Sequence, residues 1–376
     1  MLSNKKILLT AGGTGGHVNP ALAVAGAIRS KYPSAEILFV GTSDRIETKI
    51  VPAAGYELRT IEMSGFQRKL NLKNIKHNFK TVQRVLKSTG AVNRILDEFK
   101  PDVVVGFGGY VSGPVVRCAA KRGIPTAIHE QNAYPGVTNK ALAKLVDKVM
   151  LTVPEAEKNM TLKNPAVVTG LPVRMEICEA DKSVCRAMLS LDERPLVLSM
   201  GGSLGANTIN EAMLGLITKL ADTKKCKFIH ATGQYGLWFG DRLKSNGVDF
   251  ENNEDIEIRE YINDMDVCMP AADLVICRAG ASTISELQVT GKASILIPSP
   301  NVAENHQYHN AMALVRNAAA ILIEEKDLTD ETLYKTVNEL LDDPEKLVEI
   351  GANARKMAIT DATDRILDAV CSIIER

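Results

Sequence analysis

Two stretches of this chain begin in the same way: a short apolar strand leads into a glycine-rich loop and then into a helical pattern. The first reads 6-KILLTAGGTGGH-17 and the second reads 196-LVLSMGGSLGA-206. Glycine lets the backbone approach a ligand closely, and the N-terminus of the helix that follows favours negative charge. The repetition predicts two similar domains in tandem, each with a candidate ligand-binding loop.

Apolar strand-like segments alternate with helical patterns from one end of the chain to the other. The predicted strands are Lys6–Thr10, Glu36–Val40, Val103–Gly106, Pro125–His129, Lys148–Leu151, Leu196–Met200, Phe228–Ala231, Asp273–Cys277, Ser294–Pro298 and Ala319–Ile323. Such alternation is typical of parallel sheets with helices on both faces. We therefore expect an α/β protein made of two doubly wound, Rossmann-like domains that bind ligands at the carboxyl ends of their strands.

Glycine and proline, which favour turns and loops, predict a domain boundary near 169-TGLPVR-174. The predicted domains are residues 1–171 together with a C-terminal helix at 358–376, and residues 172–357. The helix after the first glycine loop is expected to open at Pro20. The last helix is expected at about Asp361–Ile374.

Length and charge exclude several classes of protein. At roughly 100–200 residues per domain, 376 residues fit two domains, and a formal net charge of zero gives no general attraction to nucleic acid. No apolar run approaches the ~20 residues of a membrane span, and the first strand follows the N-terminus too closely for a signal peptide. The seven cysteines are scattered without a CxxC pair, which favours a reducing cytosol and argues against structural zinc.

Neither glycine loop matches the dinucleotide fingerprint. Both 12-GGTGG-16 and 201-GGSLG-205 depart from GxGxxG, and the second strand ends in Gly41 and Thr42 without the acid that would bind a ribose. An NAD-dependent oxidoreductase is therefore disfavoured, and tight packing turns without a ligand remain an alternative for each loop.

A nucleotide site is predicted in 273-DLVICRAGASTISELQVTGKASILIP-298. A helix is expected to begin near Ala281, so Ser282 and Thr283 lie at its N-terminus, where free N–H groups and the helix dipole hold phosphate. Glu286 lies one turn inside the helix. Thr283 and Glu286 also have the spacing of a capping box, so a purely structural role stays open.

Two further polar segments are candidates for the site. In 301-NVAENHQYHNA-311, Gln307 is expected to offer its amide to a polar ligand, whereas His306 and His309 lack the third ligand of a metal site. In 129-HEQN-132, three polar residues directly follow a strand, a position that often carries function.

Taken together, the motifs GGTGGHVNPALA, GFGGYVSGP, HEQN, GLPVR, GGSLGA, CRAGASTISE and ENHQ resemble the MurG family. The resemblance runs in order from Lys6 to about Asn310. It implies a GT-B glycosyltransferase whose two domains face each other across a cleft, with the last helix crossing back onto the N-terminal domain. The implied activity is inverting transfer of N-acetylglucosamine from UDP-N-acetylglucosamine to lipid I, forming lipid II for peptidoglycan synthesis.

The resemblance also implies roles for individual residues. Ile262 would meet the uracil through its backbone, Glu286 would hold the ribose hydroxyls, and Gln307 and Asn132 would contact the sugar. The pyrophosphate would lie near Ser203, Arg174 and the helix start. The full set expected at the donor is Thr14, Gly15, Gly16, Asn132, Arg174, Ser203, Ile262, Arg278, Ala281, Ser282, Thr283, Ile284, Ser285, Glu286 and Gln307. Gly108, Gly109, Tyr110 and Ser112 are expected on the acceptor side.

The implied reaction needs a general base and stabilisation of the departing UDP. His17 is the first candidate base, because imidazole changes its protonation near neutral pH, and Glu130 is the second. A helix N-terminus and a cation would stabilise the leaving group without a metal or another cofactor. A UDP-N-acetylglucosamine 2-epimerase and a non-catalytic UDP-sugar-binding protein are the alternatives.

A membrane surface is the expected partner of one basic stretch. Residues 68–96 hold eight basic residues and no acidic one, within a chain of zero net charge. As a helix, this stretch would place Leu72, Ile75 and Phe79 on one side and Lys73, Lys76 and Lys80 on another. The enzyme is therefore expected to lie peripherally on the cytoplasmic face of the cell membrane, where cell-wall synthesis proteins are possible partners. An ordinary core face and solvent face form the simpler alternative.

Overall fold

The computed structural model describes residues 2–62, 88–202 and 204–375. Its contacts divide the chain into two compact units: Met1–Pro172 together with Asp361–Arg376, and Val173–Thr360. The predicted boundaries, after residue 171 and before residue 358, fall close to this division. We refer to the first unit as the N-terminal unit and to the second as the C-terminal unit.

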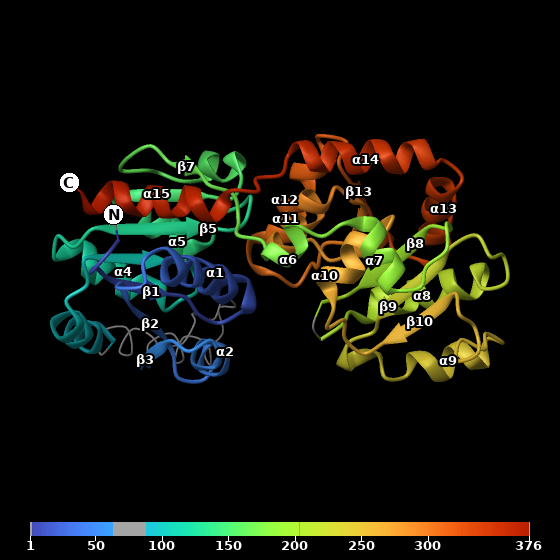
Figure 1. Cartoon of the computed structure of the whole chain (residues 1–376), viewed down its shortest axis with the longest axis horizontal. Coiled ribbons are helices and arrows are strands. Elements are labelled where there is room, and N and C mark those ends of the chain that lie inside the picture. The colour runs from blue at the N-terminus through green and yellow to red at the C-terminus, as the bar shows by residue number, and fades with distance from the viewer. Residues whose placement is uncertain (1, 63–87, 203, 376) are drawn as a thin grey trace, which may run out of the picture. The chain divides into compact units, whose positions relative to one another are not determined.

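The N-terminal unit is built on a parallel sheet of seven strands in the described part of the chain, in the order β3-β2-β1-β4-β5-β6-β7 (Figure 1). Its elements are β1 (Lys6–Thr10), α1 (Gly15–Lys31), β2 (Glu36–Thr42), α2 (Glu47–Ala53), β3 (Glu57–Ile61), a helix at residues 88–99, β4 (Val103–Gly106), α4 (Ser112–Lys121), β5 (Thr126–Glu130), α5 (Val137–Leu142), β6 (Lys148–Leu151), the 3-10 helix η1 (Pro154–Asn159), β7 (Val167–Val168) and α15 (Ala362–Ile374).

The C-terminal unit repeats this design around a six-stranded parallel sheet in the order β10-β9-β8-β11-β12-β13. Its elements are α6 (Met175–Cys178), α7 (Lys182–Met188), β8 (Leu196–Met200), α8 (Asn207–Leu220), β9 (Lys227–Ala231), η2 (Gln234–Gly236), α9 (Phe239–Ser245), β10 (Ile256–Arg259), α10 (Met265–Ala271), β11 (Leu274–Cys277), α11 (Ala281–Thr290), β12 (Ala293–Leu296), η3 (Ala303–Asn305), α12 (His306–Val315), β13 (Ile321–Leu322), η4 (Glu325–Asp327), α13 (Asp330–Leu341) and α14 (Pro344–Lys356).

The strand order identifies where each unit binds its ligands. In both sheets the chain moves outward in one direction, returns to the middle and then moves outward in the other direction. The point of reversal lies between β1 and β4 in one sheet and between β8 and β11 in the other. Loops at the carboxyl ends of these strands diverge and leave a crevice at the switch point. All four of these loops contain glycine.

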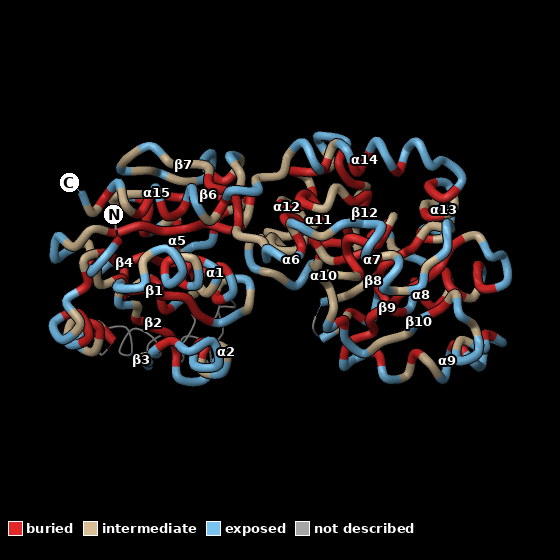
Figure 2. The backbone as a smooth tube through the Cα atoms, in the orientation of Figure 1, coloured by how far each residue is buried: buried red, intermediate tan, exposed pale blue. Residues whose placement is uncertain are grey.

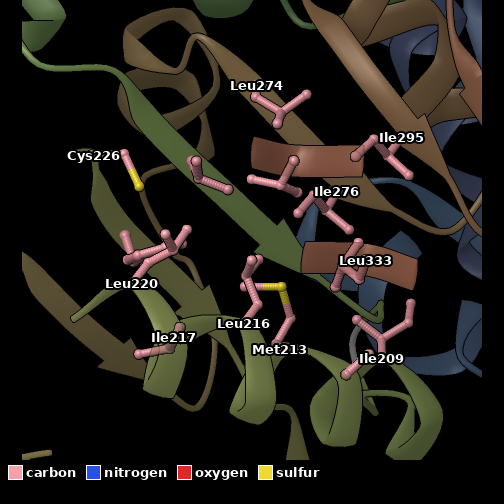
Figure 3. Close-up of a cluster of buried hydrophobic side chains, with 14 of the residues drawn as sticks. Ile209, Met213, Leu216, Ile217, Leu220, Cys226, Leu274, Ile276, Ile295 and Leu333 are labelled. Atoms are coloured by element: carbon pink, nitrogen blue, oxygen red, sulfur yellow. The ribbon is translucent and has the colours of Figure 1, made fainter. Parts of the chain in front are cut away.

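The central strands are buried on both faces because helices cover both sides of each sheet. Residues of β4 and β11 are all buried, and buried strands run through the middle of each unit in Figure 2. In the C-terminal unit, side chains of α8 such as Ile209, Met213 and Leu216 pack together with residues of β11 and β12 (Figure 3).

The last helix belongs to the N-terminal unit, as the resemblance implied. Ile366, Val370 and Ile373 of α15 are buried in the same cluster as Val24 and Ile28 of α1. This apolar stripe fixes the C-terminal end of the chain to the first sheet. None of the helices in the described part of the chain is long and apolar enough to cross a bilayer.

Every predicted strand has a counterpart in the structure, and three of the strands within the described ranges were missed. These are β3, β7 and β10, all at the edges of their sheets. An edge strand has one neighbour and more solvent, so its sequence carries fewer apolar residues. The prediction that the first helix opens at Pro20 was wrong, because α1 begins at Gly15 and Pro20 lies inside it.

Two glycine loops interlock at the switch point of the N-terminal unit. The loop after β4 turns at Gly109, whose φ of +80° is left-handed backbone. A Cβ atom on Gly109 would lie 2.3 Å from the carbonyl oxygen of Gly12, in the loop after β1. Only glycine allows the two backbones to approach this closely.

We predict that Gly109→Ala destabilises the N-terminal unit. Left-handed backbone costs a non-glycine residue about 1–2 kcal/mol, and the overlap with Gly12 adds to that cost. For a domain of this size, about 2 kcal/mol corresponds to a loss of roughly 4–8 °C in Tm. The measurement is thermal unfolding followed by circular dichroism or calorimetry.

Gly26→Ala is the matched control. Gly26 is exposed in the middle of α1, and a Cβ there would meet no atom within 4 Å. Alanine is a better helix former by about 1 kcal/mol, so this variant should be as stable as the parent or more stable. Equal Tm values for Gly109→Ala and the parent would show that the loops are not held as described.

Candidate active site

His17 lies in the first turn of α1, at the centre of the interlocked loops. Its ring rests against Gly108, where a Cβ atom would come within 2.8 Å of the imidazole Nδ1. The Nδ1 atom is 3.0 Å from Oε1 of Gln131, and the side chain is half-buried. Nε2 has no hydrogen-bond partner among the residues that the structure describes. One nitrogen of His17 is therefore held by the protein and the other is open.

Behind Gln131 lies a second histidine, which is completely buried. Nε2 of Gln131 is 3.1 Å from Nδ1 of His129 and 3.0 Å from the backbone oxygen of the same residue. Nε2 of His129 is 2.8 Å from the carbonyl oxygen of Gly170, and its ring stacks on Phe107. Burial lowers the pKa of His129 to about 4, so this imidazole is neutral at neutral pH.

Glu130 has a different role from the one predicted for it. Its carboxylate is 1% exposed and accepts hydrogen bonds from the backbone N–H and the side chain of Asn132, from the N–H of Gly136 and from Nδ2 of Asn139. These donors occupy both oxygens. The prediction of Glu130 as a second base is therefore replaced: this carboxylate holds the loop that carries Gln131 and Asn132.

The first glycine loop already contains an internal anion. Glu47 is completely buried, and its Oε2 accepts a hydrogen bond from the N–H of Gly13 at 3.1 Å. Its Oε1 accepts bonds from the N–H and hydroxyl of Thr42 at 2.9 and 2.6 Å. A phosphate at Gly13 would meet this carboxylate, so the loop after β1 is not organised as a nucleotide phosphate site.

The remaining predicted residues of the N-terminal unit fall into two groups. Thr14 is exposed as the N-cap of α1, Gly15 and Gly16 form its first turn, and Tyr110 is 52% exposed, so all four are accessible to a ligand. Ser112 is not. Its hydroxyl is buried beside the carbonyl oxygens of Gly108 at 2.7 Å and Thr10 at 3.0 Å, so its predicted contact with an acceptor was wrong and its role is structural.

In the C-terminal unit, α11 begins at Ala281 as predicted, with Gly280 as the N-cap. No side chain caps this helix and no acidic residue lies in its first turn. The N–H groups of Ala281, Ser282 and Thr283 therefore lack partners within the helix and favour an anion. The capping-box alternative was wrong, because Thr283 is the third residue of the helix and does not stand at the cap.

Glu286 is a carboxylate without hydrogen bonds among the described residues. Its side chain is 18% exposed, and its nearest cation is Arg174, with 3.9 Å between Nη2 and Oε1. Burial raises the pKa of Glu286, and the Arg174 guanidinium partly opposes this shift. Burying a carboxylate without donors costs free energy, so this side chain is prepared for a ligand that brings hydroxyl or N–H groups.

Arg278 was predicted at the donor site but is held inside the unit. Its guanidinium forms an ion pair with Glu325 and donates hydrogen bonds to the Ile297 carbonyl oxygen at 3.1 Å and to the Thr208 hydroxyl at 3.4 Å. Ile284 and Ser285 are each 5% exposed. None of these three side chains is available to a ligand in the way that was expected.

Two other segments present polar groups near the ends of the strands. Gln307 accepts a hydrogen bond from the N–H of Ser299 through Oε1 at 2.8 Å, which fixes its amide and leaves its NH₂ group to donate. Ile262 is buried, and neither its N–H nor its carbonyl oxygen bonds to another described residue. Ser203 lies outside the described residues. Within those residues, no group of three or more His, Cys, Asp or Glu side chains could hold a metal ion.

Sequence reasoning missed Glu47 as well as the pairing of Gln131 with His17 and His129. The search for an acid ended at Thr42, the last residue of β2, whereas the acid that binds the loop stands five positions later. The contact between Gln131 and His17 joins residues 114 positions apart. A polar residue after each of two central strands was the available signal for that pairing.

Comparison with family models gives a match in each unit. The model of the glycosyltransferase family 28 N-terminal domain matches residues 7–151, and that of the family 28 C-terminal domain matches residues 196–366. Together these matches cover most of the chain. The predicted fold class, two doubly wound Rossmann-like domains of the GT-B type, is confirmed.

Curated relatives align over nearly the whole length. The UDP-N-acetylglucosamine–N-acetylmuramyl-(pentapeptide) pyrophosphoryl-undecaprenol N-acetylglucosamine transferase of Desulforamulus reducens is 42% identical over 99% of both chains. The protein of the same name from Desulfitobacterium hafniense is 44% identical over 96% of this chain and 97% of that protein.

The chain is more similar to a solved MurG structure than to a solved 2-epimerase structure, both in TM-score and in sequence identity. The crystal structure of Acinetobacter baumannii MurG aligns with a TM-score of 0.79 at 29% identity, covering 98% of this chain and 99% of that one. A UDP-N-acetylglucosamine 2-epimerase from Neisseria meningitidis aligns with a TM-score of 0.65 at 12% identity, which shows a shared fold alone. The chain belongs to glycosyltransferase family 28 and, within it, to the MurG family of N-acetylglucosamine transferases.

Proposed function

We propose that this chain transfers N-acetylglucosamine from UDP-N-acetylglucosamine to the muramyl sugar of lipid I, with inversion at the anomeric carbon, to form lipid II. The relatives that align over the whole chain are named for this transfer. Within the structure, one observation carries the proposal: an uncapped helix N-terminus lies one turn before a carboxylate that accepts no hydrogen bond from any described residue.

This pair of features matches a nucleoside diphosphate sugar. The N–H groups at the start of α11 suit the pyrophosphate, and Arg174 lies close enough to Glu286 to contribute positive charge there. The Glu286 carboxylate suits the two ribose hydroxyls, which donate the hydrogen bonds that it lacks. The first unit is disfavoured for this ligand because Glu47 already occupies its glycine loop.

The uracil and the sugar of the donor would be bound by Ile262 and Gln307, respectively. The N–H and carbonyl oxygen of Ile262, which bond to no other residue of the described ranges, match the acceptor and donor edge of uracil. The NH₂ group of Gln307 is directed by Ser299 and would donate to a sugar hydroxyl. Thr14, Gly15, Gly16 and Asn132 remain proposed donor contacts from the N-terminal unit.

His17 is the proposed general base. The acceptor hydroxyl oxygen attacks the anomeric carbon, the bond between that carbon and the β-phosphate oxygen breaks, and its electron pair leaves with UDP. The hydroxyl proton passes to Nε2 of His17, which has no other partner in the described chain. The positive end of α11 and Arg174 stabilise the departing diphosphate, so the proposed step needs no metal.

The membrane surface remains a proposal from the sequence. Most of the basic stretch at residues 68–96 lies outside the described residues, as do Phe66 and Leu70, which were expected to add apolar contacts with the membrane. A lipid-linked acceptor and a nucleotide-sugar donor would meet on the cytoplasmic face of the membrane. Four or five basic residues at about 1 kcal/mol each would give reversible, salt-sensitive attachment.

A UDP-N-acetylglucosamine 2-epimerase is the second candidate, because that fold and that donor are shared. One assay separates the two activities and a pure binding function. UDP release that requires a lipid I analogue supports transfer, release without an acceptor or formation of the epimer supports an epimerase, and binding without either supports a sensor.

We predict that Glu286→Ala weakens UDP binding by roughly 10- to 100-fold. Loss of a charged hydrogen bond costs about 1.5–3 kcal/mol. The ligand-free variant should keep or increase its Tm, because the mostly buried carboxylate accepts no hydrogen bond from the part of the chain that the structure describes. Isothermal titration with UDP and thermal unfolding measure the two effects.

Glu339→Ala, on an exposed position of α13 in the same unit, is the control and should change neither quantity. Unchanged UDP affinity in Glu286→Ala would remove this residue from the donor site.

We predict that His17→Ala lowers kcat by about 10²–10⁴, the usual contribution of a general base. The KM for UDP-N-acetylglucosamine should change little, because His17 acts on the acceptor hydroxyl. Steady-state kinetics with a soluble lipid I analogue measure both constants. Gly26→Ala on the same helix is the control, and an equal loss of donor affinity and turnover would place His17 at the donor.

We predict that reversing Lys73, Lys76, Lys80 and Lys87 to Glu abolishes sedimentation with anionic vesicles and slows transfer to full-length lipid I. Transfer to a short-chain soluble acceptor should remain nearly intact. Reversal of Lys326 and Lys335, which are exposed in the C-terminal unit, is the control. Vesicle binding that persists in the quadruple variant would place the membrane face elsewhere.

A further inference from the structure

We propose that Gln131 and His129 are positioning residues that hold His17 in one tautomer, with the proton on Nδ1 and the lone pair on Nε2. The inference rests on the proposed role of His17 as the base and adds what prepares it for that role. It follows from three hydrogen-bonded links in the N-terminal unit, which begin at the carbonyl oxygen of Gly170 and end at His17.

The first link fixes the proton of His129. Its Nε2 lies 2.8 Å from the carbonyl oxygen of Gly170, which can only accept a hydrogen bond. Nε2 must therefore carry the proton. Because burial keeps this imidazole neutral, with a pKa of about 4, its Nδ1 carries a lone pair.

The second link fixes the amide of Gln131. One end of that amide faces two acceptors, the Nδ1 lone pair and the backbone oxygen of His129, at 3.1 and 3.0 Å. Only the NH₂ group can donate to both. A flipped amide would place its oxygen against two other acceptors in a site where Gln131 is 3% exposed and water cannot intervene.

The third link fixes His17. With its NH₂ group committed to His129, Gln131 presents Oε1 to Nδ1 of His17 at 3.0 Å. This oxygen accepts only, so Nδ1 of His17 carries the proton and Nε2 of the neutral ring carries the lone pair. That is the protonation state in which the open nitrogen can take a proton from a hydroxyl.

The surroundings keep each link in place. The His129 ring stacks on Phe107 with 5.7 Å between centroids, and Nδ2 of Asn139 donates to the His129 backbone oxygen at 3.1 Å. The neighbouring carboxylate, Glu130, faces its own loop and holds it. Gly108 packs closely against the His17 ring and so limits its movement on that side.

We call the chain of hydrogen bonds from Gly170 through His129 and Gln131 to His17 the relay. It positions His17 without itself transferring a proton. When Nε2 accepts the hydroxyl proton, His17 becomes a cation that donates through Nδ1 to the neutral amide oxygen of Gln131. The proton stays on His17 until it leaves through Nε2, and neither Gln131 nor His129 changes its protonation.

The direct test reads the tautomer in the full-length, ligand-free protein. Nitrogen-15 NMR of histidine-labelled protein distinguishes protonated from unprotonated ring nitrogens, and comparison with His17→Gln assigns the His17 signals. At a pH where His17 is neutral, we expect a protonated Nδ1 and an unprotonated Nε2. Gln131→Leu, which removes the amide, should convert this pattern to a mixture or to the opposite tautomer.

Kinetics supply the second readout. Gln131→Leu should lower kcat at least about 10-fold, within the about 10²–10⁴ that a general base contributes, and leave the KM for UDP-N-acetylglucosamine unchanged. Gln131→Glu keeps an acceptor toward Nδ1 of His17, so it should retain the His17 tautomer. Its second carboxylate oxygen replaces the NH₂ group opposite the two acceptors of His129, so this variant should also lower the Tm.

Two further variants separate the relay from simple packing. His129→Phe keeps an aromatic ring against Phe107 and removes the Nδ1 acceptor, so only the backbone oxygen of residue 129 still holds the Gln131 NH₂ group, and the His17 tautomer should shift toward a mixture. Thr169→Val is the control: the Thr169 hydroxyl donates to the same Gly170 oxygen at 3.1 Å, and its loss leaves the His129 link intact. Thr169→Val should therefore keep both the tautomer and kcat.

A His17 ring with its proton on Nε2 in the parent protein would overturn the proposal, as would an unchanged tautomer in Gln131→Leu. The base assignment fails separately: normal turnover in His17→Ala would reject His17 as the base while the NMR result for its tautomer stood.

Discussion

The close approach of Gly109 to the carbonyl oxygen of Gly12 is the contact on which the site in the N-terminal unit depends. It joins the loops after β1 and β4, the two strands on either side of the switch point. With the loops in this position, the His17 ring lies on Gly108 and reaches Gln131, which follows the next strand of the sheet. Buried Glu47 holds the first loop from the other side through the N–H of Gly13. The arrangement of these side chains is thus a product of backbone packing, in which each side chain takes a position that the glycines leave open.

The two units share a topology but differ in whether an acidic side chain of the unit itself occupies the glycine-rich loop or helix start at the switch point. In the N-terminal unit, the anion-binding capacity of the first loop is satisfied internally by Glu47, which also accepts two bonds from Thr42. In the C-terminal unit, the first turn of α11 contains no acidic residue, and the Glu286 carboxylate accepts no hydrogen bond from the residues that the structure describes. A buried carboxylate without donors is unfavourable in the ligand-free protein. The buried Glu286 carboxylate therefore raises the free energy of the ligand-free C-terminal unit, and a ligand with hydroxyl groups would lower it. In the N-terminal unit, the Glu47 carboxylate already accepts hydrogen bonds from the protein.

The sequence alone predicted those strands and helix starts that are marked by residues close together in the chain. Central strands such as Val103–Gly106 are short apolar runs, and the start of α11 is marked by glycine followed by small polar residues. The edge strands β3 and β10 were missed because their half-exposed residues do not form such runs. Glu130 and Ser112 were misassigned for another reason. Glu130 ends β5 and Ser112 begins α4 after the loop that follows β4, both places where function is common, but only the fold shows that their polar atoms already have partners. The relay from Gly170 to His17 could not be predicted, because its links depend on contacts between residues 41 and 114 positions apart.

The position of Gly170 has a consequence for how this enzyme can be recombined with its relatives. Its carbonyl oxygen binds His129, and its N–H donates to Leu151, yet the boundary between the units follows only two residues later, after Pro172. The segment that leads out of the N-terminal unit is therefore bonded to the residues that end at His17. A chimaera that takes its C-terminal unit from another species is best spliced at residue 173 or beyond. A splice a few residues earlier would make the residue that binds His129 part of the foreign segment, and would change the N-terminal unit in an experiment meant to change only the C-terminal one.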